Sequence, residues 1–272
     1  MRDSWDIVKL ARHPKRPTSI DLIGYLFSDF IELKGDRLFK DDSSIVGGIG
    51  TLNGIPVTVI AEEKGFDTNS KIQRNFGMPH PEGYRKAIRL MRQAEKFNRP
   101  IITIIDTPGA YPGIGAEERG QAQAIAYNLY EMMGLKTPII TVVLSEGGSG
   151  GALAIGVADK IIMFENSVFS ILSPEGFASI LYKDASLASK AANLMKLTAF
   201  DLKELNIIDE IVFEGNGLHE DKLVGYKNLK EVLIDLIKKE SITPIEKLLE
   251  NRYMKYRNIG VYLEGVKDES KI

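Results

Sequence analysis

The stretch Leu144-Ser145-Glu146-Gly147-Gly148-Ser149-Gly150-Gly151-Ala152-Leu153 decides how this chain folds. It follows residues 138–144, an apolar run whose β-branched content is typical of a buried strand. Residues 152–158 are compact and apolar, as in a core helix. The stretch therefore predicts a strand, a glycine turn and a helix. Glycine permits a tight turn, and the first amides of a helix have no internal partners, so such a turn is suited to holding negative charge.

A second unit of the same kind precedes the first. Residues 101–105 predict a strand, the turn Asp106-Thr107-Pro108-Gly109-Ala110-Tyr111-Pro112-Gly113-Ile114-Gly115 follows, and residues 116–133 predict a helix. Strands and helices that alternate at this spacing favour crossover connections and a largely parallel sheet. Function is expected beyond the carboxyl ends of such strands, where both turns lie. The candidate substrate-binding glycines are Gly147 and Gly148 in one turn and Gly109 and Gly113 in the other.

The region before these units predicts a hairpin and two helices. Residues 44–50 and 55–61 are β-like and are joined by Asn53-Gly54, a strong hairpin signal. A helix is expected over 18–33, capped by Thr18 and ended by Gly35, and another over 81–97. The basic segment 1–17 is expected to be an exposed lead-in, with contact to a partner or to a phosphate as the alternative. Residues 62–80 are expected to be a long loop, of a length that is often functional.

The region after the units predicts short strands and then helices. Strands are expected over 160–164, 168–172 and 208–213, and helices after Ser173-Pro174 and over 187–197, 199–205 and 223–258. The last helical pattern breaks near Thr243-Pro244, and it predicts either a lid on the core or a partner surface. The basic side chains between Lys64 and Lys96 are expected to be mostly solvated, with some of them facing an anionic ligand.

Composition narrows the class of protein. The chain has 272 residues and a net charge of −2, so no global field attracts nucleic acid. It has no cysteine, which excludes disulfides, thiolate zinc sites and a cysteine nucleophile. Its three histidines show no metal-binding spacing, so no metal site is expected. With no secretory signal and no long uncharged apolar run, the expected location is cytoplasmic, without a membrane segment.

A serine hydrolase is the sharpest alternative function. The run Gly147-Gly148-Ser149-Gly150-Gly151 matches G-x-S-x-G between a strand and a helix, and Asp209 and His219 follow in the order that such hydrolases use. In a run so rich in glycine, however, the match requires only one serine. The second glycine turn also has no place in a Ser-His-Asp mechanism. A nucleotide site is weaker still, because Leu153 occupies the last glycine position of G-x-G-x-x-G.

Two further interpretations need no catalytic side chain. In one, the paired glycine turns expose backbone N–H groups that hold one or two enolate-like oxygens. Each donor then lowers the activation barrier by on the order of 3 kcal/mol. In the other, the chain is a non-catalytic scaffold or binding partner with a degenerate site. The absence of an obvious acid, base or metal motif motivates both.

Seven motifs along the chain are specific in combination rather than singly. They are Gly47-Gly48-Ile49, Arg74-Asn75-Phe76-Gly77-Met78-Pro79, Pro81-Glu82-Gly83-Tyr84-Arg85-Lys86-Ala87, Asp106 through Gly113, Gly115-Ala116-Glu117-Glu118-Arg119-Gly120-Gln121, Glu146 through Gly156, and Ser173-Pro174-Glu175-Gly176. Together they resemble one known family, that of the α subunit of the carboxyltransferase of bacterial acetyl-CoA carboxylase. The resemblance covers roughly residues 11–212.

The resemblance implies a fold and a reaction. It implies an α/β, crotonase-like (ClpP-like) spiral of ββα units with helical extensions at both ends. It also implies transfer of a carboxyl group from carboxybiotin, on the biotin carboxyl carrier protein, to acetyl-CoA, which gives malonyl-CoA for fatty acid synthesis. Matched position by position, the glycines that donate oxyanion-hole N–H groups fall on Gly150 and Gly151. A valine at 151 is expected to abolish turnover by filling the space of the ureido ring.

The resemblance also implies partners and a domain organisation. The active site is expected to be shared with a carboxyltransferase β subunit in an α2β2 heterotetramer, with zinc only on the β subunit and no covalently bound cofactor on this chain. The chain alone is expected to be inactive. The expected organisation is one carboxyltransferase domain over 1–272, with a helical lead-in (1–43), a crotonase-like core (44–213) and a helical C-terminal arm (214–272).

Overall fold

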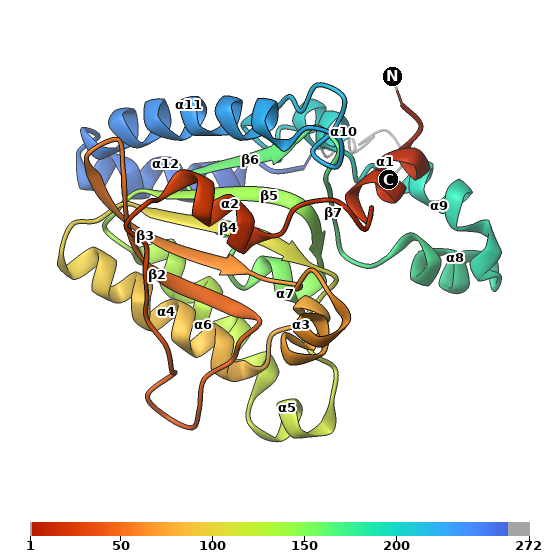
Figure 1. Cartoon of the computed structure of the whole chain (residues 1–272), viewed down its shortest axis with the longest axis horizontal. Helices are drawn as coiled ribbons and strands as arrows, with labels where there is room; N and C mark the ends of the chain where they lie inside the picture. The colour runs from red at the N-terminus through yellow and green to blue at the C-terminus, as the bar shows by residue number, and fades with distance from the viewer. Residues whose placement is uncertain (1, 261–272) are drawn as a thin grey trace, which may run out of the picture.

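The computed structural model describes residues 2–260, and its centre is an eight-stranded sheet with helices on both faces (Figure 1). The strands lie in the order β1-β2-β3-β4-β5-β6-β8, and β7 pairs with the far end of β5. Their bounds are β1 (Ile31–Glu32), β2 (Ile45–Leu52), β3 (Ile55–Glu62), β4 (Ile101–Thr107), β5 (Ile139–Gly148), β6 (Lys160–Phe164), β7 (Val168–Ser170) and β8 (Glu210–Val212).

The predicted hairpin is confirmed. Strands β2 and β3 pair antiparallel up to Leu52 and Ile55, and Asn53 and Gly54 turn the chain with positive φ values of 49° and 81°. Both values are those of the two-residue turn that matches the twist of a hairpin. From β3 onward the ladder is parallel through β4, β5, β6 and β8, which confirms the largely parallel core.

One face of the sheet is covered by α2 (Ser19–Leu26) and α11 (Lys222–Ser241), and the other by α4 (Pro81–Lys96) and α6 (Gln121–Gly134). Figure 1 shows α11 lying along the sheet for most of its length. Leu229, Leu233 and Ile237 of α11 are buried in the same cluster as the side chains of β3, β4 and β5. The expectation that this region is a lid or a partner surface is therefore wrong for α11, because its apolar stripe is one wall of the core.

The final described helix, α12 (Ile245–Arg257), is joined to the core by a buried arginine. Arg252 is fully buried and bonds to both carboxylate oxygens of Asp159 at 2.7 and 2.8 Å. It also donates to three carbonyl oxygens near the end of α6, those of Met132, Leu135 and Thr137. A guanidinium can be buried when its fixed fork of donors is satisfied in this way.

The helix expected over residues 18–33 is shorter than predicted. It ends at Leu26, and Ile31–Glu32 form β1 against β2. The reason lies in β2, because a Cβ on Gly48 would lie 2.6 Å from the Phe30 ring and one on Gly50 would lie 2.9 Å from Phe27. The two glycines therefore leave room for these aromatic rings to cross the strand. The apolar spacing that suggested a longer helix serves this packing instead, and Gly35 is not a helix end.

Two further predictions needed correction. The loop expected over 62–80 contains α3 (Thr68–Gln73), which begins with a capping box between Asp67 and Ser70, and a 3-10 turn, Asn75–Gly77. The helix expected over 116–133 is divided into α5 (Ile114–Glu118) and α6, because Gly120 adopts a left-handed φ of 85° between them. The other predicted helices are present as α4, α8 (Pro174–Tyr182), α9 (Ala188–Met195) and α10 (Ala199–Glu204).

The N-terminal segment is folded, contrary to the expected exposed lead-in. Residues Ser4–Ala11 form α1, which buries Ile7 and Val8 against α9. Arg16 is buried and pairs with the fully buried Glu214 through two contacts of 2.6 and 2.8 Å. Among the described residues, no helix is long and apolar enough to span a bilayer.

Candidate functional site

The glycine-rich stretch is more extended than the sequence predicts. β5 continues through Gly147 and Gly148, because Thr107 pairs with Gly147 and β7 pairs with residues 146–148. Helix α7 then begins at Ser149 and ends at Leu153. The turn is therefore a single sharp corner, at which Ser149 adopts a left-handed φ of 50°. Such a conformation costs a non-glycine residue free energy, and it persists only where the surroundings impose it.

The two glycine turns interlock. A Cβ on Gly148 would lie 2.2 Å from the carbonyl oxygen of Pro108, and one on Gly151 would lie 2.6 Å from the carbonyl carbon of Gly109. Both contacts are with backbone, which cannot move aside as a side chain can. The space beside Gly151 is therefore filled by the second turn rather than open for a ligand ring. The expected reason for the intolerance of a valine at this position is corrected accordingly.

The amides of Gly150 and Gly151 lie in the first turn of α7, where a helix has no internal acceptors for its N–H groups. Within residues 2–260, no carbonyl or side chain outside regular elements accepts a hydrogen bond from either amide. Gly150 is half-buried and Gly151 is buried. A Cβ on Gly150 would meet only Ile125, at 3.5 Å, so the two positions differ in what surrounds them.

The other candidate glycines have different surroundings. Gly147 and Gly148 line a narrow cleft of about 40 Å³ between the turn and the start of α8. Gly109 has a φ of 152°, and its amide donates to the Thr107 hydroxyl at 3.0 Å. Gly113 caps α5 with its Cα against the Tyr111 ring. The structure thus brings Gly109, Gly147 and Gly148 to the junction of the two turns, whereas Gly113 lies further along the second one.

A cluster of charged groups holds the glycine turn at the end of β5. Lys64, which follows β3, lies 2.7 Å from Asp106 and 3.4 Å from Glu146. Burial alone would lower the pKa of Lys64, but the charges of Asp106 and Glu146 raise it. Burial would likewise raise the pKa of Glu146, but Lys64 and Arg12 lower it. Both groups are therefore charged at neutral pH, and they fix the residue that directly precedes the glycines.

Arg12 extends this cluster to the helices outside the sheet. Its guanidinium contacts Glu146 at 2.6 Å and Glu175, in the first turn of α8, at 2.7 Å. Arg16 reaches the same strand end from the buried side, donating to the Leu144 carbonyl at 2.7 Å and to the Ser145 hydroxyl at 3.0 Å. The basic N-terminal segment thus contacts this chain's own site, through the arginines at 12 and 16.

Glu62 is a buried carboxyl group below the second turn. Its Oε2 accepts the Asp106 amide at 3.3 Å, whereas Oε1 has no partner among the described residues. Burial, and then the nearby charge of Asp106, raise the pKa of Glu62 well above its ordinary value of 4.5. The group is therefore protonated in the folded chain under conditions in which it ionises in the unfolded chain.

A pH dependence of stability follows for Glu62→Gln. Above pH 4.5 the folded chain retains a proton that the unfolded chain releases, so this carboxyl makes the free energy of unfolding fall as the pH rises. The amide mimics the neutral carboxyl and removes this dependence. We expect the free energy of unfolding of the variant, relative to that of the parent, to rise by more than about 1 kcal/mol from pH 5 to pH 8, as measured by urea unfolding. Glu204→Gln, at an exposed position, is the control. The expectation would be contradicted if the difference in the free energy of unfolding between Glu62→Gln and the parent were the same at pH 5 and at pH 8.

A larger cavity opens beside the charge cluster. It has a volume of about 700 Å³ and lies between residues 14–21 and the segment 63–74. Arg74 and Lys15 line it, and the exposed ring of Phe66 stands at its edge. A smaller adjoining cavity shares Arg16 and Phe66 with it and reaches Lys64 and Asp106. The volume suits a cofactor-sized substrate, and the path leads toward the glycine turns.

The geometry does not support a Ser-His-Asp hydrolase. Asp209 accepts the amide of Ile161, at the amino end of β6, and pairs with Lys255. Ser149 lies at the opposite, carboxyl end of β5. The His219 ring instead lies against His13, with centroids 4.5 Å apart. Within the described residues, no imidazole or carboxylate hydrogen-bonds to the Ser149 hydroxyl.

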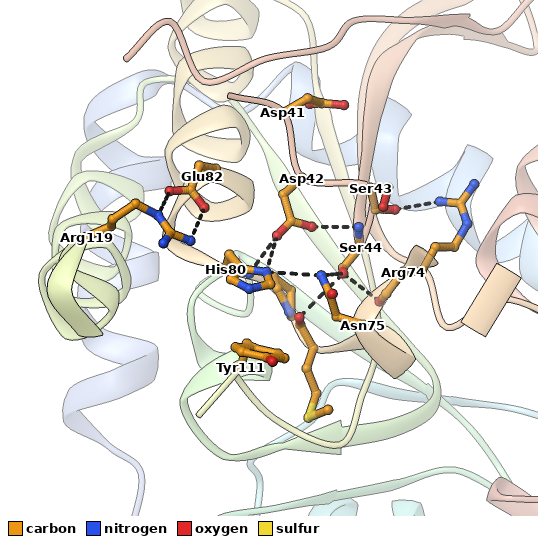
Figure 2. Close-up of polar contacts among 12 residues, drawn as sticks. Asp41, Asp42, Ser43, Ser44, Arg74, Asn75, His80, Glu82, Tyr111 and Arg119 are labelled. Atoms are coloured by element: carbon orange, nitrogen blue, oxygen red, sulfur yellow. Dashed lines mark hydrogen bonds and ion pairs between the residues drawn. The ribbon is translucent and has the colours of Figure 1, made fainter. Parts of the chain in front are cut away.

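One pair near the second turn was not predicted. The buried carboxylate of Asp42 bonds to His80, whose ring lies on Tyr111 of the second glycine turn (Figure 2). The carboxylates near the carboxyl ends of β3, β4 and β5, at positions 62, 106 and 146, are not predicted as part of the site either. Acidic residues at the ends of three neighbouring parallel strands are a signal that the sequence does carry.

Comparison with known proteins gives consistent matches. A family model described as acetyl co-enzyme A carboxylase carboxyltransferase-like matches residues 2–260. Proteins named acetyl-coenzyme A carboxylase carboxyl transferase subunit alpha are similar over most of their length. One from Clostridium perfringens is 57% identical over 94% of this chain and 95% of its own, and one from Bacillus cytotoxicus is 58% identical over 94% and 79%.

Solved structures show the same fold at low identity. A transcarboxylase 12S structure superposes with a TM-score of 0.68 at 17% identity, covering 82% of this chain and 41% of that one. A Pseudomonas malonate decarboxylase hetero-tetramer superposes with a TM-score of 0.64 at 18% identity, covering 78% and 84%. These likenesses confirm the crotonase-like fold.

Proposed function

This chain belongs to the acetyl-CoA carboxylase carboxyltransferase family as an α subunit, and from that premise we propose how its glycine turns serve the reaction. We propose that the amides of Gly150 and Gly151 hold the negative charge that develops on the ureido oxygen when carboxybiotin gives up its carboxyl group. Backbone donors at a helix start stabilise such an oxyanion without a titratable side chain. Neither residue carries a side chain of its own beside these amides.

The observation that supports this proposal most is the hydrogen bonding of the Gly150 and Gly151 amides. They are the first-turn donors of α7, and within residues 2–260 no carbonyl or side chain outside regular elements accepts from them. The interlocked backbone of residues 108–110 holds them in place, so their geometry is fixed before substrate binds. The half-buried Lys64, between Asp106 and Glu146, holds the end of the strand.

The proposed reaction balances without an added base. The N–C bond of carboxybiotin breaks, and its electron pair passes to the ureido group, whose oxygen accepts from the two amides. The ureido nitrogen then takes a proton from the methyl group of acetyl-CoA, and the resulting carbanion forms the new C–C bond with the released carboxyl carbon. The chain's contribution is to bind, orient and neutralise charge.

The family membership implies a β-subunit partner. We propose in addition that carboxybiotin arrives on a biotin carboxyl carrier protein, that zinc belongs to the β subunit, and that the assembly is an α2β2 heterotetramer. Exposed apolar side chains on the projecting α8–α9 region, such as Ile171, Ile180 and Leu194, support a protein contact there (Figure 1).

Reconstitution tests the function directly. The chain is mixed with a cognate β subunit, and decarboxylation of malonyl-CoA is measured in the presence of biocytin. We expect activity from the complex and none from either subunit alone. A folded complex without biocytin-dependent activity would contradict the proposal.

A fluorophosphonate probe tests the serine hydrolase alternative, and it is expected to leave Ser149 unlabelled.

We expect Arg74 to contact an anionic part of a substrate, because it lines the 700 Å³ cavity. Arg74→Ala should raise KM for malonyl-CoA or for biocytin about tenfold, since a charge-assisted hydrogen bond contributes roughly 1.5–3 kcal/mol. Which KM rises identifies the group that is bound. Arg89→Ala is the matched control, because among the described residues the Arg89 side chain donates only to the carbonyls of Lys34 and Gly35. Unchanged KM values for both substrates in Arg74→Ala would rule this contact out.

A further inference from the structure

Asp42 and His80 form a pair that the oxyanion chemistry does not use. The Asp42 carboxylate is buried, and its Oδ2 accepts the backbone amide of His80 at 2.7 Å and lies 3.1 Å from the ring nitrogen Nδ1. Oδ1 accepts the amide of Ser44 at 2.6 Å. The side-chain amide of Asn75 lies 3.0 Å from the same Nδ1. Both contacts are to one ring nitrogen, which either donates to Asp42 or accepts from Asn75, so the imidazole is held at its Nδ1 edge in either tautomer, as Figure 2 shows.

The oriented ring lies on the second glycine turn. The centroids of the His80 and Tyr111 rings are 4.1 Å apart, and the ring planes are 23° from parallel. The Tyr111 amide donates to the Pro79 carbonyl at 3.1 Å. The Gln121 side chain donates to the carbonyls of both Pro79 and Tyr111, at 2.8 and 2.9 Å. The chain at Tyr111 is thus locked to the chain at His80 by the ring contact and by these bonds.

This lock reaches the proposed donors through backbone. Tyr111 follows Gly109 and Ala110, whose main-chain atoms lie directly against Gly151. A shift of Tyr111 would therefore move the surface on which the corner at Ser149–Gly151 rests. Catalytic geometry is sensitive to displacements on the order of 1 Å, even when they originate away from the reacting atoms.

The segment that carries His80 is conformationally strained. Asn75, Phe76 and Gly77 have successive left-handed φ values of 49°, 56° and 78°. Ser44 holds the segment by donating its hydroxyl to the Arg74 carbonyl at 2.6 Å. The left-handed conformation is costly for the bulky Phe76, and such strain persists only where surrounding contacts over-determine it, typically at functional sites. A Cβ on Gly77 would lie 2.7 Å from Lys64, so the strained segment packs against the charge cluster as well.

We propose that His80, oriented by Asp42, is a positioning residue: its ring fixes Tyr111 and thereby holds the second glycine turn against Gly151. This inference rests on the proposed function of Gly150 and Gly151. His80 touches no reacting atom in this account. Its effect is on the alignment of the amide donors, so its loss should lower kcat and leave substrate binding largely intact.

The test uses the complex with the β subunit, whose parent activity is established first. His80→Ala should lower kcat about tenfold and change the KM values for malonyl-CoA and biocytin by less than about twofold. His80→Phe, which retains a ring on Tyr111, should recover most of the kcat. Hydrogen exchange should be faster in His80→Ala for peptides covering residues 107–115, and unchanged in the rest of the sheet.

His219→Ala is the matched control, because its side chain is 14% exposed and that of His80 is 16% exposed. It should leave kcat and the exchange of residues 107–115 unchanged. If His80→Ala does not assemble, Tyr111→Leu removes the opposite ring and should give the same loss of kcat. A normal kcat in these variants, or a loss that His80→Phe does not restore, would overturn the positioning role. An inactive parent complex would instead count against the proposed function.

Discussion

Gly151→Val should abolish carboxyl transfer by the complex with the β subunit. The added Cβ would lie 2.6 Å from the carbonyl carbon of Gly109 and 2.7 Å from the amide nitrogen of Ala110, distances that real Cβ atoms do not show. Because both atoms are backbone, the two turns must separate, and the amides of residues 150 and 151 move away from the oxygen they are proposed to hold. We expect kcat to fall by at least about 10²–10³, the range for loss of an oxyanion-hole donor.

Two glycine variants show whether this loss is specific. Gly24→Ala adds a Cβ in α2 with no atom within 4 Å, so turnover should be unchanged. Gly150→Ala adds a Cβ at an ordinary 3.5 Å from Ile125, so this variant should fold and should lose far less activity than the valine variant. Near-normal turnover by a folded Gly151→Val complex would refute the assignment of these amides.

Arg16→Met should produce the largest loss of stability. It leaves the fully buried carboxylate of Glu214 without its cation, and it removes the donors to the Leu144 carbonyl and the Ser145 hydroxyl. Breaking a buried pair on one side costs about 3–5 kcal/mol. We expect a decrease of this size in the free energy of unfolding, measured by urea titration at pH 7.

Lys9→Met provides the control for Arg16→Met. Lys9 forms an ion pair with Asp6 on the surface of α1, with more than half of each side chain exposed. Exposed pairs contribute about 0–1 kcal/mol, so this variant should unfold almost as the parent does. Equal stability losses in the two variants would show that the N-terminal segment is not held by the Arg16–Glu214 pair.

The sequence was most informative where local chemistry and the final structure agree. Asn53-Gly54 predicts a hairpin because two successive left-handed residues suit that turn, and both adopt positive φ values. The alternation of apolar strands and amphipathic helices predicts the parallel sheet, and the long helices α4 and α11 lie where their apolar spacing places them. The glycine candidates at the junction of the turns were found because few other residues permit such close backbone contact.

The remaining errors come from contacts between distant residues. Nothing local shows that Arg16 meets Glu214, which lies 198 positions away, so the sequence predicts an exposed lead-in. The sequence likewise predicts that Lys86 is solvated, but it is fully buried and lies 2.7 Å from Asp41. The filled space beside Gly151 depends on how a second turn packs, which no single stretch of sequence reveals.

Replacement of the Gly151 amide by an ester, through incorporation of glycolic acid at this position, tests the central claim most directly. The change removes one N–H donor and adds no side-chain atom. If main-chain amides neutralise the ureido oxyanion, kcat of the complex should fall by about 10²–10³ while the KM for biocytin stays near its parent value. The same replacement at Gly24 should have no effect on turnover. Parent-like kcat in the Gly151 ester would contradict the account.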